Sequence, residues 1–576
     1  MRVRSIVAPL LALAVVGGLF SFGCPADGPP PPSDEGPRDT LVIGATADAK
    51  DLLPPVYQQA ADAHVIEAIF MDPLDGDFDC AVQYRPELAK SWTWDESGKV
   101  LSVELRDDLT WYDGTKVTAK DLAFAYELVA DDAVASPRKP YVARMDPNAR
   151  PKVIDDFHVE WHFTEVYDRP TMLAHTSHPP VPKHLLEKAD RASLRTHALN
   201  TGIPVANGPW KVTAREKNVK LVLEPNEKYT GPPERKPKLR RVVFKTLPEY
   251  ATRIVELENG SVDLVENLLV ADADSLAQEH PEIRLHRRGW RSMDYVAWNN
   301  IDPNDYKAQS ATTPQPKITG LKPHPLFGDR EVRRALAGAV DVDKLIRDLL
   351  TSKVTGEVYG RPAIGSITPA LCGMHNDTIQ RIPFDPAAAR ARLAELGWTD
   401  TNGDGVLDKD GVPFRFTMIT NSGNERRAQA SVIVQANLKE VGVDVQIEKL
   451  ESGTFFDRLR KKDFDAALSG WSAALFIDPS STWGEDSVFN FTSYHNPAVS
   501  ALIERGLREP DPEKAKPIWH ELQQVVYDDQ PYDFLYWLDE IVAVHSRFEN
   551  VKIDVLAPYR DLWAWSVPPD KVKYKQ

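Results

Sequence analysis

The sequence predicts a soluble body of α/β or α+β lobes that follows an N-terminal export segment. The chain has 576 residues, and 42% of them are hydrophobic, which is enough for a large core and more than one lobe. Strand-like runs alternate with helical runs along the whole body, and neither a short repeat nor a low-complexity block occurs after residue 38. This mixture favours α/β or α+β lobes over a barrel, a helix bundle or a solenoid.

Short apolar or alternating runs predict strands, and apolar residues at helical spacing predict helices. One helix has both boundaries marked, because Asp385-Pro386 precedes it and Gly397 follows it. The clearest strands are predicted at 41–44, 100–105, 242–244 and 443–447, and the clearest helices at 387–396, 428–441 and 515–526.

The first 23 residues have the order of a bacterial secretion signal. Arg2 and Arg4 precede an apolar run over 6–20, which is shorter than the roughly 20 residues that a membrane-spanning helix needs. The segment resembles a lipoprotein signal (1–23) with lipid attachment at Cys24, although Ser21 stands where such signals usually have leucine. An ordinary cleaved signal beside an unrelated cysteine stays an alternative.

Residues 24–38 are rich in proline and contain nothing that could fill a core. We expect an extended, solvated tether. The body would then work outside the cytoplasm, in the periplasm or at the cell surface, and a lipid on Cys24 would hold it at a membrane.

Composition limits the partners and the cysteine chemistry. A formal net charge of −16 argues against nucleic acid as a partner, because nucleic acid binds to basic surfaces. Only Cys80 and Cys372 remain after Cys24. A bond between two moving lobes would lock their motion, so we expect two buried free thiols, with a disulfide as the alternative.

Two phrases make the prediction specific. They are Arg85-Pro86-Glu87-Leu88-Ala89-Lys90-Ser91-Trp92 and the run from Trp111 to Leu122, which contains a turn at Asp113-Gly114 and a helix start at Thr118 with Asp121 in a capping box. Together they resemble the extracytoplasmic solute-binding proteins of the oligopeptide and dipeptide class, family 5, which serve ABC importers.

Further phrases follow in the order of that family. They occupy 207–212, 259–263, 324–336, 394–398, 469–471 and 494–497, so the resemblance spans about 40–565. It implies an α/β two-lobe periplasmic-binding-protein clamshell of type II, in its large cluster C form. Lobe I would comprise residues 40–72, 215–295 and 535–576. Residues 73–214 would form an inserted subdomain of this lobe, and residues 296–534 would form lobe II.

The resemblance also implies a function without catalysis or a cofactor. The protein would be a monomer that captures a solute, expected to be an oligopeptide, by hinge closure and delivers it to an ABC permease. A peptide sensor, an envelope chaperone, or an importer component for a sugar or metal chelate remains an alternative. The sequence contains none of three common enzyme motifs, namely the Gly-x-Ser-x-Gly elbow of hydrolases, the HExxH helix of zinc proteases and the Walker phosphate-binding loop.

One departure concerns the ligand. In peptide-binding members an aspartate three positions after the glycine-tryptophan pair binds the peptide ammonium, and Ala474 takes that place here. Asp478 could supply a displaced carboxylate, or Asp478-Pro479 could be a plain turn.

The candidate site residues lie in three stretches. Trp471 offers apolar area and one donor, although it could also be a core residue, and Ser472 and Ala473 follow it. A strand at 290–295 would place Ser292 and Asp294 on one face and Met293 and Tyr295 on the other, and the sequence does not choose between the faces. Tyr141 is a candidate lid residue that could equally be surface packing.

Two further patterns imitate metal sites, and we expect no metal at either. Residues 400–408 start like a calcium loop, but Gly411 replaces its last ligand, so a solvated loop is expected. His175, His178 and His184 lie near a proline-rich stretch that resembles a family turn.

Overall fold

The computed structural model describes residues 39–574, with the exception of 149, 314–315, 486 and 488. The chain divides into Met1–Pro37 and Arg38–Gln576. The predicted signal segment, Cys24 and the tether lie outside the described residues. None of the helices described combines the length and apolar character that a membrane crossing requires.

A mixed eleven-stranded sheet runs through the body. The strand order is β17-β16-β18-β12-β19-β11-β1-β10-β9-β8, and β13 pairs with β19. The strands are β1 (Thr40–Ala45), β8 (Trp210–Glu216), β9 (Lys220–Pro225), β10 (Arg241–Thr246), β11 (Leu264–Val265), β12 (Ile283–Trp298), β13 (Gly360–Pro362), β16 (Arg415–Asn421), β17 (Asp444–Leu450), β18 (Ala466–Ser472) and β19 (Tyr532–His545).

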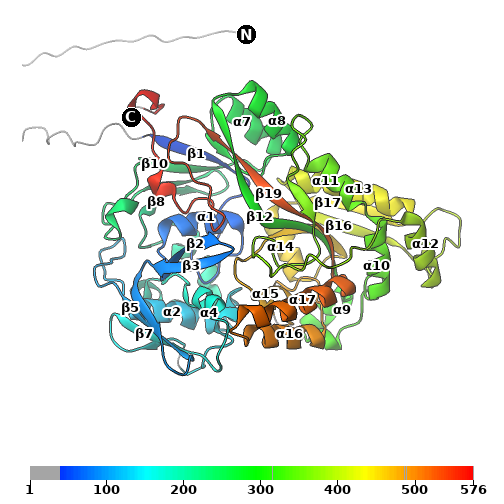
Figure 1. The fold of residues 1–576 in the computed structure, drawn as a ribbon, viewed down its shortest axis with the longest axis horizontal. Helices are drawn as coiled ribbons and strands as arrows, with labels where there is room; N and C mark the ends of the chain where they lie inside the picture. The colour runs from blue at the N-terminus through cyan, green and yellow to red at the C-terminus, as the bar shows by residue number, and fades with distance from the viewer. Residues whose placement is uncertain (1–38, 149, 314–315, 486, 488, 575–576) are drawn as a thin grey trace, which may run out of the picture. The chain divides into compact units, whose positions relative to one another are not determined.

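Two long antiparallel strands, β12 and β19, connect two separate cores, and Figure 1 shows them side by side. Ile283 and Ile541 belong to one core, and Val296 and Leu535 belong to the other. We call the part with β1, β8–β11, α1 (Ala60–Ile69), α7 (Tyr250–Glu258) and α8 (Val270–Glu279) the first lobe. The part with β13 and β16–β18 is the second lobe.

The strands are irregular where they pass from one lobe to the other. The register of β12 against β19 shifts between Arg288 and Ser292, and Trp290 has a positive φ of 46°. The Trp290 amide donates a hydrogen bond of 2.8 Å to the Asp539 carboxylate, which replaces the regular pairing at this bulge.

Helices cover the second lobe, and the predicted elements are present. The helices predicted at 387–396, 428–441 and 515–526 are confirmed as α12 (Pro386–Glu395), α13 (Glu425–Glu440) and α17 (Pro512–Asp529), and the four predicted strands are β1, β5 (Val100–Leu105), β10 and β17. The helices of this lobe are α9 (Pro303–Ser310), α10 (Arg330–Ala339), α11 (Val342–Leu349), α12 (Pro386–Glu395), α13 (Glu425–Glu440), α14 (Ser452–Arg460), α15 (Ser480–Trp483), α16 (Pro497–Leu507) and α17 (Pro512–Asp529), with a small β14 (Asp408–Lys409) and β15 (Val412–Pro413) ladder.

An inserted subdomain lies between β1 and β8 in the sequence. Its helix α2 has the predicted capping box, in which Thr118 and Asp121 exchange hydrogen bonds at the first turn. The subdomain has a hairpin of β2 (Leu74–Asp79) and β3 (Ala81–Pro86), a sheet of β4 (Ala89–Trp94), β5 (Val100–Leu105), β6 (Lys152–Val153) and β7 (His158–His162), and helices α2 (Ala119–Ala130), α3 (Lys139–Val142), α4 (Arg169–Thr176), α5 (Lys183–Leu186) and α6 (Ala198–Thr201).

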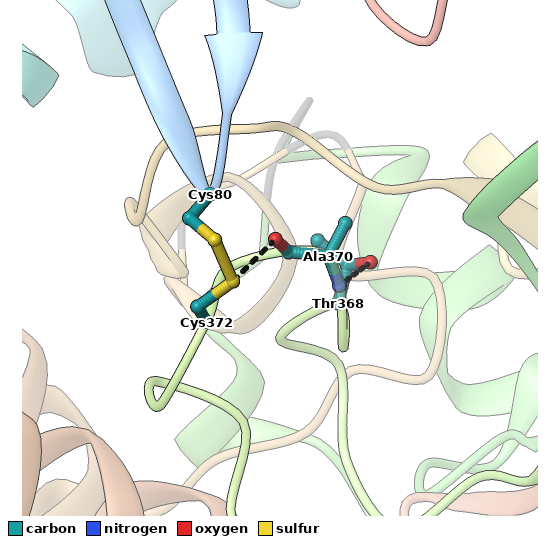
Figure 2. Close-up of a disulfide and its surroundings, with 4 residues drawn as sticks. All are labelled: Cys80, Thr368, Ala370 and Cys372. Atoms are coloured by element: carbon teal, nitrogen blue, oxygen red, sulfur yellow. Dashed lines mark hydrogen bonds between the residues drawn. A yellow bond between two sulfur atoms is a disulfide. The ribbon is translucent and has the colours of Figure 1, made fainter.

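The expectation of two buried free thiols is wrong. Cys80 and Cys372 form a disulfide, with Cα atoms 5.0 Å apart, and both residues are exposed. Figure 2 shows Cys80 at the tip of the β2–β3 hairpin and Cys372 on the loop that also carries Thr368 and Ala370. The turn of the hairpin brings Cys80 to this loop, and the 292-residue separation in sequence gave no sign of it.

Candidate ligand-binding site

A cavity of about 580 Å³ lies between the two lobes and the inserted subdomain. Its volume falls in the range of small-molecule sites, about 300–1,000 Å³. The first lobe contributes α1, the inserted subdomain contributes residues 137–141, and the second lobe contributes β18 with the loop after it and the start of α13. Because all three parts form its walls, a change in their relative position would change the cavity.

Trp471 lines this cavity as part of an aromatic wall. Its ring stacks on Phe491 with centroids 5.5 Å apart, and Phe489 meets it edge-on at 5.4 Å. The indole nitrogen donates to the Tyr532 hydroxyl at 3.2 Å. The donor is therefore used inside the protein, and the half-buried ring offers the ligand mainly apolar area.

The other predicted residues of β12 and β18 have different positions. Ser292, Ser472 and Ala473 line the cavity, whereas Tyr295 is not among the lining residues. Tyr295 is 1% exposed and stacks on Tyr532 with centroids 3.9 Å apart. It therefore supports Trp471 from behind, at a centroid distance of 6.3 Å.

Asp294 does not line the cavity but lies fully buried under it. One carboxylate oxygen accepts from Nε of Arg426 and the other from Nε of Arg427, both at 2.9 Å. Burial alone would raise the pKa of Asp294, but the two guanidinium groups hold it below its usual value. The three side chains lock the start of α13 onto β12.

Tyr141 lines the cavity from the inserted subdomain, next to Asp478 of the second lobe. The Tyr141 ring stacks on His175 at 4.6 Å, and Nε2 of His175 lies 3.1 Å from the Asp478 carboxylate. Arg144 reaches the same carboxylate at 3.3 Å. Although burial opposes it, contact with His175 and the charge of Arg144 hold the pKa of Asp478 at about 2.

Asp478 is therefore an ionised group that joins the second lobe to the inserted subdomain. Its side chain is only 2% exposed, and Ser480 donates a further hydrogen bond to it from its backbone amide at 3.0 Å. Its acceptor capacity is largely used by the protein.

Charged groups that sequence reasoning missed gather on the first-lobe side. Arg288 pairs with Glu540 at 2.8 Å, and Ser292 also donates to Glu540. Glu67 and Arg291 lie in the same wall. A signal existed in the sequence: charged residues interrupt two apolar strands, and such residues need a partner when a strand is buried on both faces.

The two metal-like patterns have other contacts. The Asp400 carboxylate accepts hydrogen bonds from the backbone amides of Gly403 and Gly405 at 2.7 and 3.0 Å. His184 pairs with Asp113 at 2.6 Å, and burial lowers the pKa of His178. Within the described residues, no group of three or more metal-binding side chains is assembled.

Comparison with known proteins gives consistent matches over most of the chain. The oligopeptide-binding protein AppA of Bacillus subtilis is 26% identical over 483 residues, which are 83% of this chain and 82% of that protein. The structure of that protein in complex with a nonapeptide matches with a TM-score of 0.81 and 23% identity, and the match covers 92% of this chain and all of that one.

A second structure has the same fold and a different ligand. NikZ from Campylobacter jejuni, in complex with Ni(L-His), matches with a TM-score of 0.76 and 22% identity over 92% of this chain and all of that one. The sequence model of the bacterial extracellular solute-binding proteins, family 5, matches residues 83–487. Because this match spans most of the chain, the protein belongs to family 5 of the bacterial extracellular solute-binding proteins.

Proposed function

We propose that this protein captures an oligopeptide between its lobes and delivers it to the permease of an ABC importer, without catalysing a reaction. The observation that supports this most directly is the cavity of about 580 Å³ with walls from both lobes and the inserted subdomain. A ligand held there contacts walls on both sides of the hinge, so its binding favours the closed form, and the Cys80–Cys372 bond limits how far the inserted subdomain can move from the second lobe.

We further propose the division into lobe I (40–72, 215–295 and 535–576), inserted subdomain (73–214) and lobe II (296–534). The irregular stretch of β12 near Trp290 and its partner Asp539 support a hinge close to these boundaries. The proposed ligand-contacting residues are Trp471, Ser472, Ala473, Ser292 and Tyr141, with Tyr295 acting through Trp471.

A lipid anchor on Cys24 is part of the proposal. It would keep the binding protein, which we expect to be a monomer, near its permease and raise the local concentration for docking. Mass spectrometry of the mature N-terminus tests this point. An unacylated terminus beyond Cys24 would show a protein that is not tethered in this way.

A ligand screen tests the proposed cargo. Binding to the folded form alone raises the unfolding temperature by mass action. We expect a shift with some of the di- to hexapeptides in a panel that also contains sugars and metal chelates. A shift with another class and none with peptides would contradict the peptide assignment.

A metal chelate is the second candidate, because Ala474 replaces the ammonium-binding aspartate and Asp478 is held by Arg144 and His175. NikZ, which has the same fold, is in complex with Ni(L-His), and this supports the second candidate. The same screen separates the two.

A non-transport sensor or chaperone on this scaffold would also bind peptides, and loss of peptide uptake on deletion of the gene distinguishes an importer from either.

A further inference from the structure

Five carboxylates line the cavity, and four of them already have partners in the protein. Asp478 is held by Arg144 and His175. Glu540 pairs with Arg288. The complete set is Asp48, Glu67, Glu266, Asp478 and Glu540.

The remaining two partnered groups are less tightly held. The Asp48 carboxylate accepts a hydrogen bond of 3.2 Å from the backbone amide of Asn218 and is 6% exposed. Glu266 lies 3.6 Å from Nδ1 of His64, with its side chain 18% exposed. Neither presents a largely open carboxylate to a ligand.

Glu67 differs from these four. Within the part of the chain that the structure describes, no hydrogen bond or ion pair involves its side chain, and the residue is exposed to the cavity. Partial desolvation raises its pKa, although the charges of His64, Arg291 and Arg288 act in the opposite direction. A carboxylate that is open to the cavity and makes no hydrogen bond or ion pair in the described part of the chain can accept hydrogen bonds from a cationic group of a ligand.

Helix α1 holds Glu67 in a fixed position. The neighbouring residues Val65, Ile66 and Ile69 are 0–3% exposed and anchor the helix in the large hydrophobic core that the first lobe shares with the inserted subdomain and the second lobe. Because the helix is already fixed, little conformational entropy is lost when the carboxylate is ordered on binding, and this strengthens the binding of a complementary group.

Side chains of both charges line the cavity, and the two arginines that act on Glu67, Arg288 and Arg291, already have partners in the protein. Arg288 pairs with Glu540 at 2.8 Å. Arg291 is tied to protein oxygens, since its Nε donates to the Ala473 carbonyl at 3.0 Å and its Nη1 to the Val555 carbonyl at 2.8 Å.

We propose that Glu67 binds a cationic nitrogen group of the ligand, in place of the carboxylate missing at Ala474. This inference rests on the proposed function. The cation is either the amino terminus of a peptide or a basic side chain, and the two sources present the same chemistry to the carboxylate. Glu67 would thus determine ligand specificity from the first lobe, whereas the aspartate of peptide-binding family members corresponds to Ala474 in the second lobe.

Isothermal titration calorimetry with four peptides tests the proposal. The probes are tetraalanine, N-acetyl-tetraalanine, and the same pair with lysine at the second position. We expect Glu67→Gln to weaken binding of the cationic probes about 10- to 100-fold, because a charge-assisted contact is lost. Glu258→Gln, an exposed helical glutamate of the first lobe outside the cavity lining, should change nothing.

The acetylated probes identify the source of the cation. If acetylation weakens wild-type binding as much as Glu67→Gln does, and has no effect on the variant, the amino terminus is the partner. If only the lysine probes respond, the partner is a side chain. Peptide binding that is equal in wild type and Glu67→Gln would overturn this inference and leave the proposed function intact, whereas no binding of any peptide would overturn both.

Discussion

Cys80, at the tip of the inserted hairpin, is bonded to Cys372 on a second-lobe loop that borders the ligand cavity. Ile367 and Leu371 of that loop line the cavity, and its Asn376 donates to the His520 carbonyl of α17 at 3.1 Å. The bond is therefore a covalent connection between the inserted subdomain and the second lobe next to the cavity lining.

Removal of this bond should loosen the closed form. We expect Cys80→Ser combined with Cys372→Ser to lower the free energy of unfolding by about 2–5 kcal/mol, because the bond restricts the unfolded chain. It should also speed ligand release, since the hairpin can then leave the loop. Calorimetry and stopped-flow release kinetics measure the two effects. A release rate equal to that of the oxidised wild type would contradict the role in closure, and reduced wild type should release ligand as fast as the double variant.

The Asp478 contacts should make the protein sensitive to acid. The folded-state pKa of about 2 lies below the unfolded value of about 4. The stability from this group is present above pH 4 and is lost as the pH falls toward 2, an amount of about 2–3 kcal/mol. Denaturant titrations at a series of pH values from 5 to 2 measure the free energy of unfolding. This free energy should fall less steeply with decreasing pH for Asp478→Asn than for wild type.

The same substitution has a predicted cost at neutral pH. Asp478→Asn leaves Arg144 and His175 without their carboxylate, which should destabilise the protein by about 3–5 kcal/mol. Glu504→Gln is the matched control, because Glu504 also pairs with Arg144, at 3.1 Å, but its side chain is 49% exposed. An equal effect of the two changes would show that burial does not decide the contribution of Asp478.

Asp533 should oppose folding at neutral and alkaline pH. Its carboxyl is buried in β19 with one oxygen lacking a hydrogen-bond partner, and burial raises its pKa to about 7. Between about pH 4 and pH 7 the folded state retains a proton that the unfolded chain has lost, so stability falls as the pH rises. We expect Asp533→Asn to be more stable than wild type at pH 8 by about 3–5 kcal/mol, and a loss of stability at pH 8 would disprove this.

Trp471 should contribute to affinity through its ring. Trp471→Ala should weaken ligand binding at least about tenfold, while Trp471→Phe should retain part of the affinity because an aromatic face remains beside Phe491. Phe384→Ala removes an aromatic side chain that is 42% exposed and not part of the cavity lining, and should leave affinity unchanged. Calorimetric titration of the three variants measures these affinities. If both Trp471 variants bound the ligand as tightly as Phe384→Ala does, Trp471 would not be a ligand contact.

Gly470 should tolerate no side chain. It pairs with Asp294 across β12 and β18, and an added Cβ would collide with the Asp294 carboxylate and the Arg427 guanidinium. Gly470→Ala should destabilise the protein by about 1–3 kcal/mol through overpacking. Gly320→Ala is the control, because its Cβ would meet no atom within 4 Å. Thermal denaturation of both variants checks the difference.

The sequence alone determined features whose causes lie within a few residues. Thr118 and Asp121 cap α2 because they are three positions apart, and Asp385 with Pro386 starts α12. These signals need no knowledge of how distant segments meet. The expectation for Trp471 rested instead on the family resemblance of residues 469–471, and its place in the cavity lining comes from the structure.

Only the tertiary structure decided which distant groups meet. Cys80 and Cys372 are 292 residues apart, and Asp294 meets Arg426 across 132. Glu67 was not found from the sequence, because an exposed helical glutamate looks the same on an outer surface and in a cavity. Partners and solvent exposure depend on the approach of separate segments, and local propensity does not encode that approach.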